Sequence, residues 1–155
     1  MSGIFGDPEV MKYGDGVKSI AWVKDWLYRC REIYRNERVT GPLAVVEKKS
    51  GNTIGYCGLT RIDDVCGKSE IQLGYRLTTR YWGMGYATEA AFSVLEYGFG
   101  PLGLIRVIAI IDPINMASLN VTRKLGMSYE KDVFLPEYAH PDHVYVITKK
   151  NTTPP

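Results

Sequence analysis

The sequence predicts a single mixed α/β domain in which a mostly antiparallel sheet contains one parallel strand–helix–strand crossover. Three observations indicate this class. Apolar residues recur at steps of three and four in residues 17–37, which is typical of a helix that faces a core. In residues 43–77 they alternate with polar residues, as in half-buried strands. Residues 104–111 form an almost continuous apolar run, as in a central strand covered on both faces.

The N-terminal half is expected to hold one helix and three strands linked by hairpins. The helix covers Val17–Glu37 and is amphipathic. The strands Leu43–Glu47 and Thr53–Ile62 follow, joined by the turn residues Ser50–Asn52. A third strand covers Ser69–Leu77, and its strict alternation predicts one buried and one polar face.

The C-terminal half is expected to alternate helices and strands. A largely apolar helix over Tyr86–Phe99 leads into the strand Leu104–Ile111, and this pair makes the parallel crossover. A second helix covers Asn115–Gly126 and ends at a glycine, a common stop signal. Two strands, Ser128–Leu135 and His143–Thr148, complete the expected sheet.

Composition bounds the organisation and the partners. Residues 1–150 are expected to form one domain, followed by a polar tail over residues 151–155. The net charge is +2 and basic residues do not cluster, so neither nucleic acid nor a membrane surface is an expected partner. The chain holds neither a secretion signal nor an apolar stretch of about 18 residues. The widely spaced Cys30, Cys57 and Cys66 suggest the reduced thiols of a cytoplasmic protein.

No metal site is expected from the sequence. His140 and His143 form an H-x-x-H pair, but Pro141 between them argues against a helical pair of ligands. No cysteine cluster accompanies them. We therefore expect a loop that leads into the last strand.

The stretch RYWGMGYATEA, Arg80 to Ala90, places two glycines just before the predicted middle helix. Gly83 and Gly85 could serve only to make a tight turn. They also begin like the dinucleotide-binding pattern G-x-G-x-x-G, although Thr88 stands at the third glycine position. A third interpretation is an anion cradle, in which backbone N–H groups and the helix dipole bind a pyrophosphate.

The same stretch resembles a known family. Residues 80–85 match [RQ]-x-x-G-x-[GA], the acyl-coenzyme A signature of the GNAT N-acetyltransferases. The longer string LGYRLTTRYWGMGYATEA is similar to the branch that includes the RimJ/RimL-type acetylases of ribosomal-protein N-termini. Asn115, Ser118, Lys124 and Gly126 fit that branch's N-x-x-S-x-x-x-x-x-K-x-G pattern. The resemblance runs from about Phe5 to the last strand and implies a GNAT-like domain.

The resemblance implies acetyl-CoA as the co-substrate and an amine as the acceptor, with no metal. The pyrophosphate would lie on the amides of residues 83–87, and a bulge near Gly74 would offer an N–H to the thioester oxygen. The expected cofactor contacts are Tyr75, Leu77, Arg80, Trp82, Gly83, Met84, Gly85, Tyr86, Ala87, Asn115, Ser118 and Lys124.

The leaving thiolate needs a proton donor. Many members of the wider family carry a tyrosine seven residues after the asparagine, but this chain has Thr122 there. By resemblance Ser118 lies near the sulfur and is an expected catalytic residue, with Tyr129 or water as alternatives. Asn115 could bind the cofactor, cap its helix, or do both.

The acceptor amine needs a base, and here the chain departs from its relatives. Where the branch often carries a glutamate, this chain has Gln72, which cannot accept a proton. Glu70, two residues earlier on the same strand face, is the expected catalytic base. Glu130 is the second candidate, and deprotonation through water without a single base is the third.

The expected activity is direct acetyl transfer to a protein N-terminus, an amino acid, a polyamine or an antibiotic, among which the sequence does not choose. A non-catalytic acyl-CoA-binding module is the alternative. Relatives usually begin with a strand and helix before the FGDPEVMKY segment, so the family's first strand is expected to be missing. Because an uncovered sheet edge invites pairing, we expect either a homodimer or a destabilised protein.

Overall fold

The computed structural model describes residues 1–36, 41–135 and 140–149. The predicted tail over residues 151–155 lies outside the described residues. Within them, the strands form one mixed sheet in the order β1-β2-β3-β4-β6-β5. The strands are β1 (Gly41–Val46), β2 (Thr53–Ile62), β3 (Glu70–Leu77), β4 (Arg106–Ile111), β5 (Ser128–Val133) and β6 (Asp142–Thr148). The helices are α1 (Ser2–Phe5), α2 (Pro8–Met11), α3 (Ile20–Asn36), the 3-10 turn η1 (Thr79–Tyr81), α4 (Tyr86–Phe99) and α5 (Met116–Lys124).

The predicted α/β class and the order of its long elements are confirmed. All neighbouring strands are antiparallel except β3 and β4, which are parallel and joined through α4. The short helices α1, α2 and η1 were not expected from the sequence, because three or four residues are too few to show a helical period.

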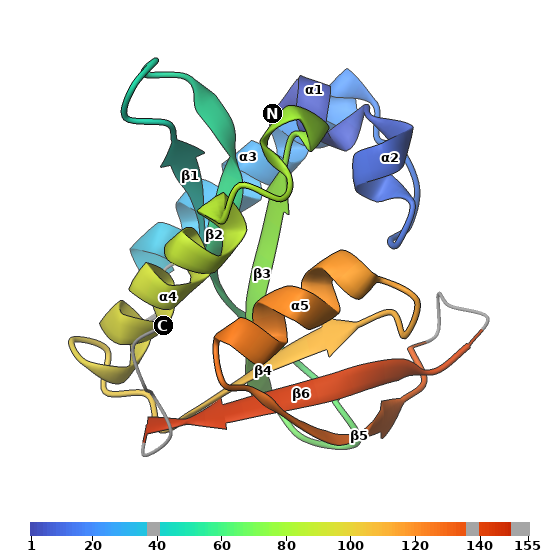
Figure 1. Ribbon diagram of the computed structural model, residues 1–155, viewed down its shortest axis with the longest axis vertical. Helices are drawn as coiled ribbons and strands as arrows, with labels where there is room; N and C mark the ends of the chain where they lie inside the picture. The colour runs from blue at the N-terminus through green and yellow to red at the C-terminus, as the bar shows by residue number, and fades with distance from the viewer. Residues whose placement is uncertain (37–40, 136–139, 150–155) are drawn as a thin grey trace.

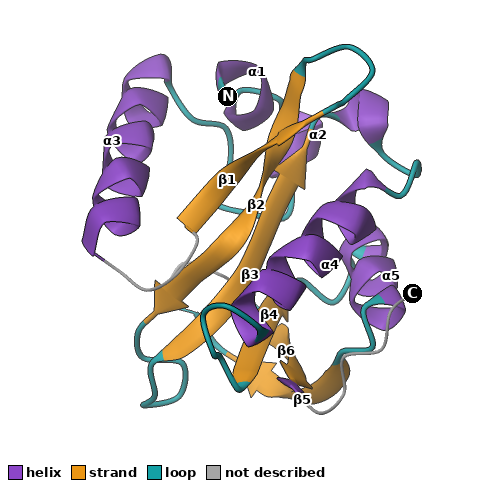
Figure 2. Ribbon diagram, turned by 90° about the vertical axis from the view of Figure 1, so that its left-hand side faces the viewer, coloured by secondary structure: helices purple, strands orange, loops and turns teal. Residues whose placement is uncertain are grey.

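Helices cover both faces of the sheet. In Figure 2, α3 lies on one face and α4 and α5 lie on the other. The main core fills the space between the sheet and α4 and α5. Its buried side chains include Leu59, Leu73, Leu95, Phe99, Val107 and Ile147.

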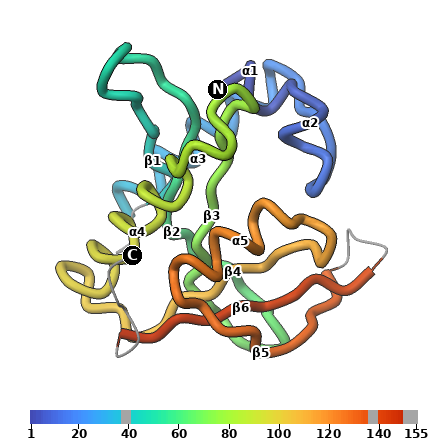
Figure 3. Tube along the Cα trace, in the orientation of Figure 1, coloured from blue at the N-terminus to red at the C-terminus, as the bar shows by residue number. Residues whose placement is uncertain are grey.

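The second face of the sheet carries two smaller clusters. Ile108 of β4 packs with Val65, Val133 and Val144, so β4 is covered on both faces as expected. Phe5 of α1 packs against Tyr56 of β2 and against two tryptophans of α3. The trace in Figure 3 accordingly places the N-terminal helices beside the end of β3, far from it in the sequence. The N-terminal segment thereby becomes part of the region where β3 ends.

The parallel strands β3 and β4 run apart (Figure 1). One register pair, Gln72 with Ile108, is described between them, near the N-terminal half of β3. The ladder between β2 and β3 is regular from Ile62 opposite Glu70 to Gly55 opposite Leu77. The expectation of a bulge near Gly74 is therefore wrong. The opening beside β3 comes instead from the divergence of β3 and β4.

Three further expectations concern the cysteines, membrane-spanning helices and the edge of the sheet. Cys30, Cys57 and Cys66 are free thiols. No helix among the described residues is long and apolar enough to cross a bilayer. No described strand lies beyond β1, which forms one edge of the sheet. The homodimer expected from that edge stays a prediction.

Candidate active site

A cavity of about 430 Å³ opens where β3 and β4 part. The C-terminal half of β3, helix α5, the glycine loop before α4, and α2 with the residues after it all contribute to its walls. The lining residues shared by these elements are Val10, Lys12, Tyr13, Tyr75, Arg76, Leu77, Tyr81, Trp82, Gly83, Gly85, Ala87, Thr88, Asn115, Ala117, Ser118, Asn120, Val121 and Lys124.

The glycine loop has the geometry of an anion cradle. Gly83 and Gly85 have φ of +73° and +87°, which side-chain-bearing residues rarely adopt. A Cβ atom at either position would meet no other atom within 4 Å, so it would project into open space. Gly85 also stands at the N-cap of α4 without a side-chain cap. The N–H groups of the first helical turn thus remain available to an anion.

Two hydrogen bonds anchor this loop. The indole Nε1 of Trp82 donates to the Leu77 carbonyl oxygen at 2.8 Å, which ties the loop to the end of β3. The Tyr86 hydroxyl donates to the Glu47 carboxylate at 3.1 Å, which ties the start of α4 to the turn after β1. The Glu47 carboxylate raises the pKa of Tyr86. The pKa of Glu47 is lowered, mainly by its hydrogen bond from the Ser50 hydroxyl and also by the one from Tyr86.

Most residues expected to contact the cofactor line this cavity. They are Tyr75, Leu77, Trp82, Gly83, Gly85, Ala87, Asn115, Ser118 and Lys124. Three expected residues do not line it. The Arg80 guanidinium lies over the Tyr81 ring, Met84 is exposed, and Tyr86 is directed to Glu47. These three belong to the loop by sequence, but their side chains leave the cavity.

Helix α5 presents its first turn to the cavity. The Asn115 side chain accepts a hydrogen bond from the Ser118 N–H at 3.1 Å, so Asn115 caps the helix and lines the cavity at once. Thr122 is buried, and its hydroxyl donates to the Leu119 carbonyl oxygen at 2.8 Å. Thr122 does not line the cavity, and its hydroxyl is used within the helix.

Tyr75 carries an unexpected feature. Its hydroxyl is buried and has no hydrogen-bond partner among the described residues. Burial raises the pKa of Tyr75 to about 12, and the nearby Ser118 hydroxyl lowers it slightly against that trend. The sequence placed Tyr75 on the buried face of β3 and assigned it to cofactor binding, but did not single out its hydroxyl. Tyr75 thus lines the cavity with a buried phenol whose hydroxyl lies next to Ser118.

The charged groups at the cavity are cationic. Lys12, Arg76 and Lys124 line it, whereas none of its described lining residues is an aspartate or glutamate. The Arg76 guanidinium is held at one wall, 3.4 Å from the Tyr56 hydroxyl and over the Phe5 ring. The cavity is thus suited to anionic groups and supplies no carboxylate as a base.

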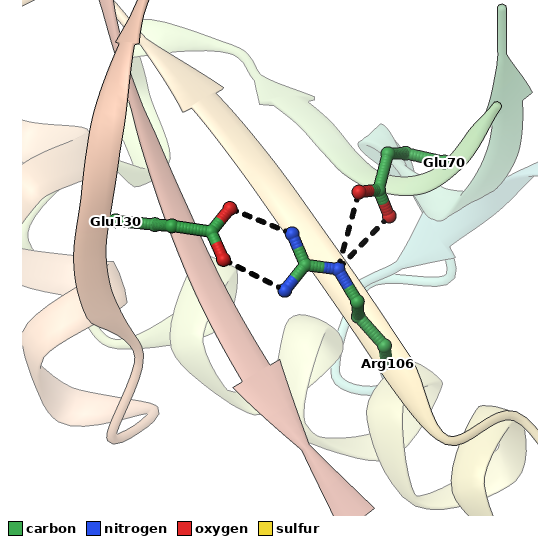
Figure 4. Close-up of polar contacts among 3 residues, drawn as sticks. All are labelled: Glu70, Arg106 and Glu130. Carbon is green, nitrogen blue, oxygen red and sulfur yellow. Dashed lines mark hydrogen bonds and ion pairs between the residues drawn. The ribbon is translucent and has the colours of Figure 1, made fainter. Parts of the chain in front are cut away.

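The residues expected to supply a base lie elsewhere (Figure 4). Glu70 stands at the N-terminal end of β3, five residues or about 16 Å along the strand from Tyr75. Both Glu70 oxygens accept from Arg106 Nε at 3.1 and 3.0 Å, and Glu130 accepts from the other guanidinium nitrogens at 3.0 and 2.7 Å. The expected base is therefore not brought to the cavity, and its partner Arg106 was not anticipated.

Tyr129, the alternative proton donor, also lies apart from the cavity. It is half-exposed on β5, and its hydroxyl donates to Asp132 at 3.0 Å. Of the side chains expected to act in proton transfer, only Ser118 lines the cavity in the described structure. Tyr75, which was not among the proton donors expected from the sequence, lines the cavity beside Ser118.

Known proteins are similar to this chain in sequence and in fold. The chain is 36% identical over 132 residues to the protein YkkB of Bacillus subtilis strain 168, covering 84% of this chain and 74% of YkkB. It is 31% identical over 136 residues to the uncharacterized N-acetyltransferase p20 of Bacillus licheniformis, covering 86% of this chain and 74% of p20. The crystal structure of a GNAT-family acetyltransferase from Bacillus anthracis superposes with a TM-score of 0.81 at 23% identity, covering 97% and 87%.

The sequence match and the structural match point to the same family. The family described as "Acetyltransferase (GNAT) domain" matches residues 1–128, which include β1 to β4, the loop and α5. We conclude that this chain belongs to the GNAT acetyltransferase family.

Proposed function

We propose that the protein is an acetyl-CoA-dependent N-acetyltransferase whose reaction takes place in the cavity between β3 and α5. The observation that carries the proposal is the glycine loop, where two positive-φ glycines leave open space beside the N-terminus of α4. This space suits the pyrophosphate of coenzyme A. Gly83, Gly85 and Ala87 would hold the pyrophosphate, while Asn115 and Leu77 would hold the pantetheine arm.

The bound thioester supplies an activated acetyl group, which passes from sulfur to the acceptor nitrogen. We assign the proton for the departing sulfur to the Tyr75 hydroxyl, with Ser118 beside it as a relay. A phenol whose pKa is raised to about 12 stays protonated at neutral pH. Its hydroxyl makes no close hydrogen bond among the described residues and lies beside the Ser118 hydroxyl, so we assign the two groups to one proton path.

The proton lost by the amine goes to water in this proposal. No carboxylate lines the cavity among the described residues, and Glu70 is engaged by Arg106. Holding the amine and the acetyl group together then supplies most of the rate. The RimJ/RimL resemblance favours a peptide N-terminus as the acceptor.

The cavity charges favour one class of acceptor further. Two positive charges at 4 Å repel by about 1 kcal/mol in water and about 4 kcal/mol near a protein surface. Lys12 and Arg76 would therefore disfavour polyamines, which carry additional ammonium groups. Amino acids and short peptides with neutral or acidic side chains are the better candidates.

The test is a panel of amines with acetyl-CoA, read out as free thiol and as the mass of the acetylated product. The panel contains peptides with free N-termini, amino acids and spermidine, and we expect spermidine to be the poorest acceptor. In parallel, acetyl-CoA at about 100 times its Kd should stabilise the fold by about 2.7 kcal/mol. Binding without turnover of any amine would identify a non-catalytic acyl-CoA-binding module and overturn the proposal.

The Tyr75→Phe variant tests the proton donor. We expect kcat to fall about 100-fold while KM for acetyl-CoA and the melting temperature stay close to wild type, since only the hydroxyl is lost. Tyr13→Phe removes a hydroxyl from another cavity residue and is the matched control, with kcat within about twofold of wild type. Equal kcat for the two variants would assign the proton to Ser118 or water.

A further inference from the structure

A second group of ligand-type side chains lies outside the cavity, where β4 ends and β6 begins. Asp112 follows β4, Asp142 begins β6, and His140 precedes it by two residues. One potential ligand atom from each residue lies within 4.8 Å of the other two. His140 Nε2 is 3.5 Å from Asp112 Oδ2, and His140 Nδ1 is 3.7 Å from Asp142 Oδ1. None of the three residues lines the cavity.

Asp142 is in an environment that an isolated carboxylate does not tolerate. The residue is only 6% exposed, and its Oδ1 atom has no hydrogen-bond partner among the described residues. A buried carboxylate without a partner is costly unless a cation balances it.

The other two side chains are held so that each directs one electron pair into the group. Asp112 Oδ1 accepts from the Ile114 N–H at 2.9 Å, which leaves Oδ2 for a second partner. His140 Nδ1 lies 3.3 Å from the Pro141 carbonyl oxygen. In the tautomer that donates to this oxygen, the lone pair of Nε2 faces Asp112. His140 Nε2 and Asp112 Oδ2 then face each other with no hydrogen atom between them.

We propose that Asp112, His140 and Asp142 bind one divalent transition-metal cation, for which Zn²⁺ is the probe. Zn²⁺ at its usual 2.0–2.2 Å from nitrogen and oxygen places tetrahedral ligands about 3.3 Å apart. The 3.5 Å between His140 Nε2 and Asp112 Oδ2 needs to close by only a few tenths of an ångström, and the ligand atom of Asp142 lies within 4.8 Å of the other two. Two carboxylates also balance the charge of the ion, and the half-exposed His140 leaves the fourth position open to water.

The donor set selects among cations. One imidazole with two carboxylates suits Zn²⁺ or Mn²⁺, whereas Mg²⁺ prefers oxygen ligands alone. A bound ion would join the end of β4 to the start of β6, three residues before Asn115 caps α5. The site is thus a structural anchor next to the cavity wall and revises the sequence-based expectation that the chain holds no metal. It does not depend on the proposed acetyltransferase activity.

The experiment measures Zn²⁺ binding directly by calorimetry on protein that carries no histidine tag and has been stripped with chelator. We expect saturable binding of one ion per chain and a higher melting temperature with Zn²⁺ but not with equal Mg²⁺. Asp142→Asn and His140→Ala should each weaken Zn²⁺ binding at least about tenfold. Absence of saturable binding to the wild type would overturn the proposal.

Two further results separate a metal site from a merely structural carboxylate. Asp142→Asn should match or exceed the wild-type melting temperature without metal, since a neutral amide is cheaper to bury, and should lose the rise caused by Zn²⁺. Asp132→Asn removes an exposed carboxylate that lies 3.6 Å from His143 Nε2 and is not one of the three proposed ligands, so it is the matched control. Equal Zn²⁺ affinity for Asp142→Asn and Asp132→Asn would place the ion elsewhere and refute the assignment.

Discussion

The parallel strands β3 and β4 are closed at one end and open at the other. At their N-terminal ends, Arg106 lies between Glu70 and Glu130 and donates to both carboxylates (Figure 4). Beyond the register pair of Gln72 and Ile108 the strands diverge, and the C-terminal half of β3 lines the cavity. One pair of strands thus supports a polar clamp and a ligand-sized opening.

The two ends differ in what their residues stabilise. In the clamp the charges of Arg106, Glu70 and Glu130 pair with one another, so the clamp stabilises the folded protein without any ligand. The open end leaves the Tyr75 hydroxyl and the amides of the glycine loop without internal partners. Groups of this kind cost stability in the free protein and repay it when a ligand binds. Variants at the two ends should therefore separate stability from binding.

Breaking the clamp should have the largest effect. Arg106→Met keeps the length of the side chain but leaves Glu70, whose side chain is 12% exposed, facing Glu130 without the guanidinium. We expect the free energy of unfolding to fall by about 2–3 kcal/mol, less than for a fully buried pair because Arg106 is 30% exposed. Urea denaturation measures this loss. The acetyl-CoA Kd should change less than about threefold.

A second substitution identifies the cause of that loss. Combining Arg106→Met with Glu70→Gln removes the unpaired carboxylate, so the double variant should be more stable than Arg106→Met alone. If the double variant is less stable, the guanidinium contributes through packing and not through its charge. An acetyl-CoA Kd that weakens tenfold in Arg106→Met would show that the two ends are coupled.

The glycine loop should give the intermediate effect, mainly on binding. Gly85→Ala places a methyl group in the open space beside the first turn of α4 at a φ of +87°. We expect the acetyl-CoA Kd to weaken at least tenfold, about 1.4 kcal/mol, and stability to fall by about 1–2 kcal/mol. Titration calorimetry with acetyl-CoA measures the first change and urea denaturation the second.

Gly51→Ala is the matched control for the loop. Gly51 has a φ of +70°, its Cβ would also meet open space, and it lies in the turn after β1 instead of at the cavity. This variant should lose similar stability and keep the wild-type Kd. Equal Kd values for Gly85→Ala and Gly51→Ala would mean that the glycines of the loop serve the turn alone.

The sequence predicted best those features that depend on local conformation. The bounds of α4 follow from its apolar stripe, and the cradle follows from two glycines that need positive φ. The expected position of Glu70 rested on strand alternation, which gives the face of a residue but not the end of the sheet where the strands part. Glu70 lies at the closed end, where it pairs with Arg106, a residue 36 positions away in the chain.

Features built from several strands were out of reach for the same reason. Asp112 and Asp142 meet because Ile111 of β4 stands opposite His143 of β6, and no spacing in the sequence encodes that register. The free hydroxyl of Tyr75 likewise depends on the position of α5 relative to β3. Long-range register and packing therefore decide which charged side chains and hydroxyl groups come together in this chain.

The smallest expected effect concerns the pH dependence of stability at the open end. Burial raises the pKa of Tyr75 to about 12, whereas an unfolded tyrosine ionises near pH 10. Below pH 10 both states are protonated and Tyr75 adds no pH dependence. Between pH 10 and 12 the unfolded chain releases its proton first, so stability falls, by about 1 kcal/mol at pH 11.

Tyr75→Phe removes this contribution, so the free energy of unfolding of the variant should decline less between pH 9 and pH 11 than that of the wild type. Urea denaturation at the two pH values measures both slopes, and the contributions of the other tyrosines cancel in their difference. A difference near 1 kcal/mol would support a neutral Tyr75 phenol at the cavity wall. Parallel slopes would mean that water already solvates the Tyr75 hydroxyl, and the open end of β3 would then hold no desolvated proton donor.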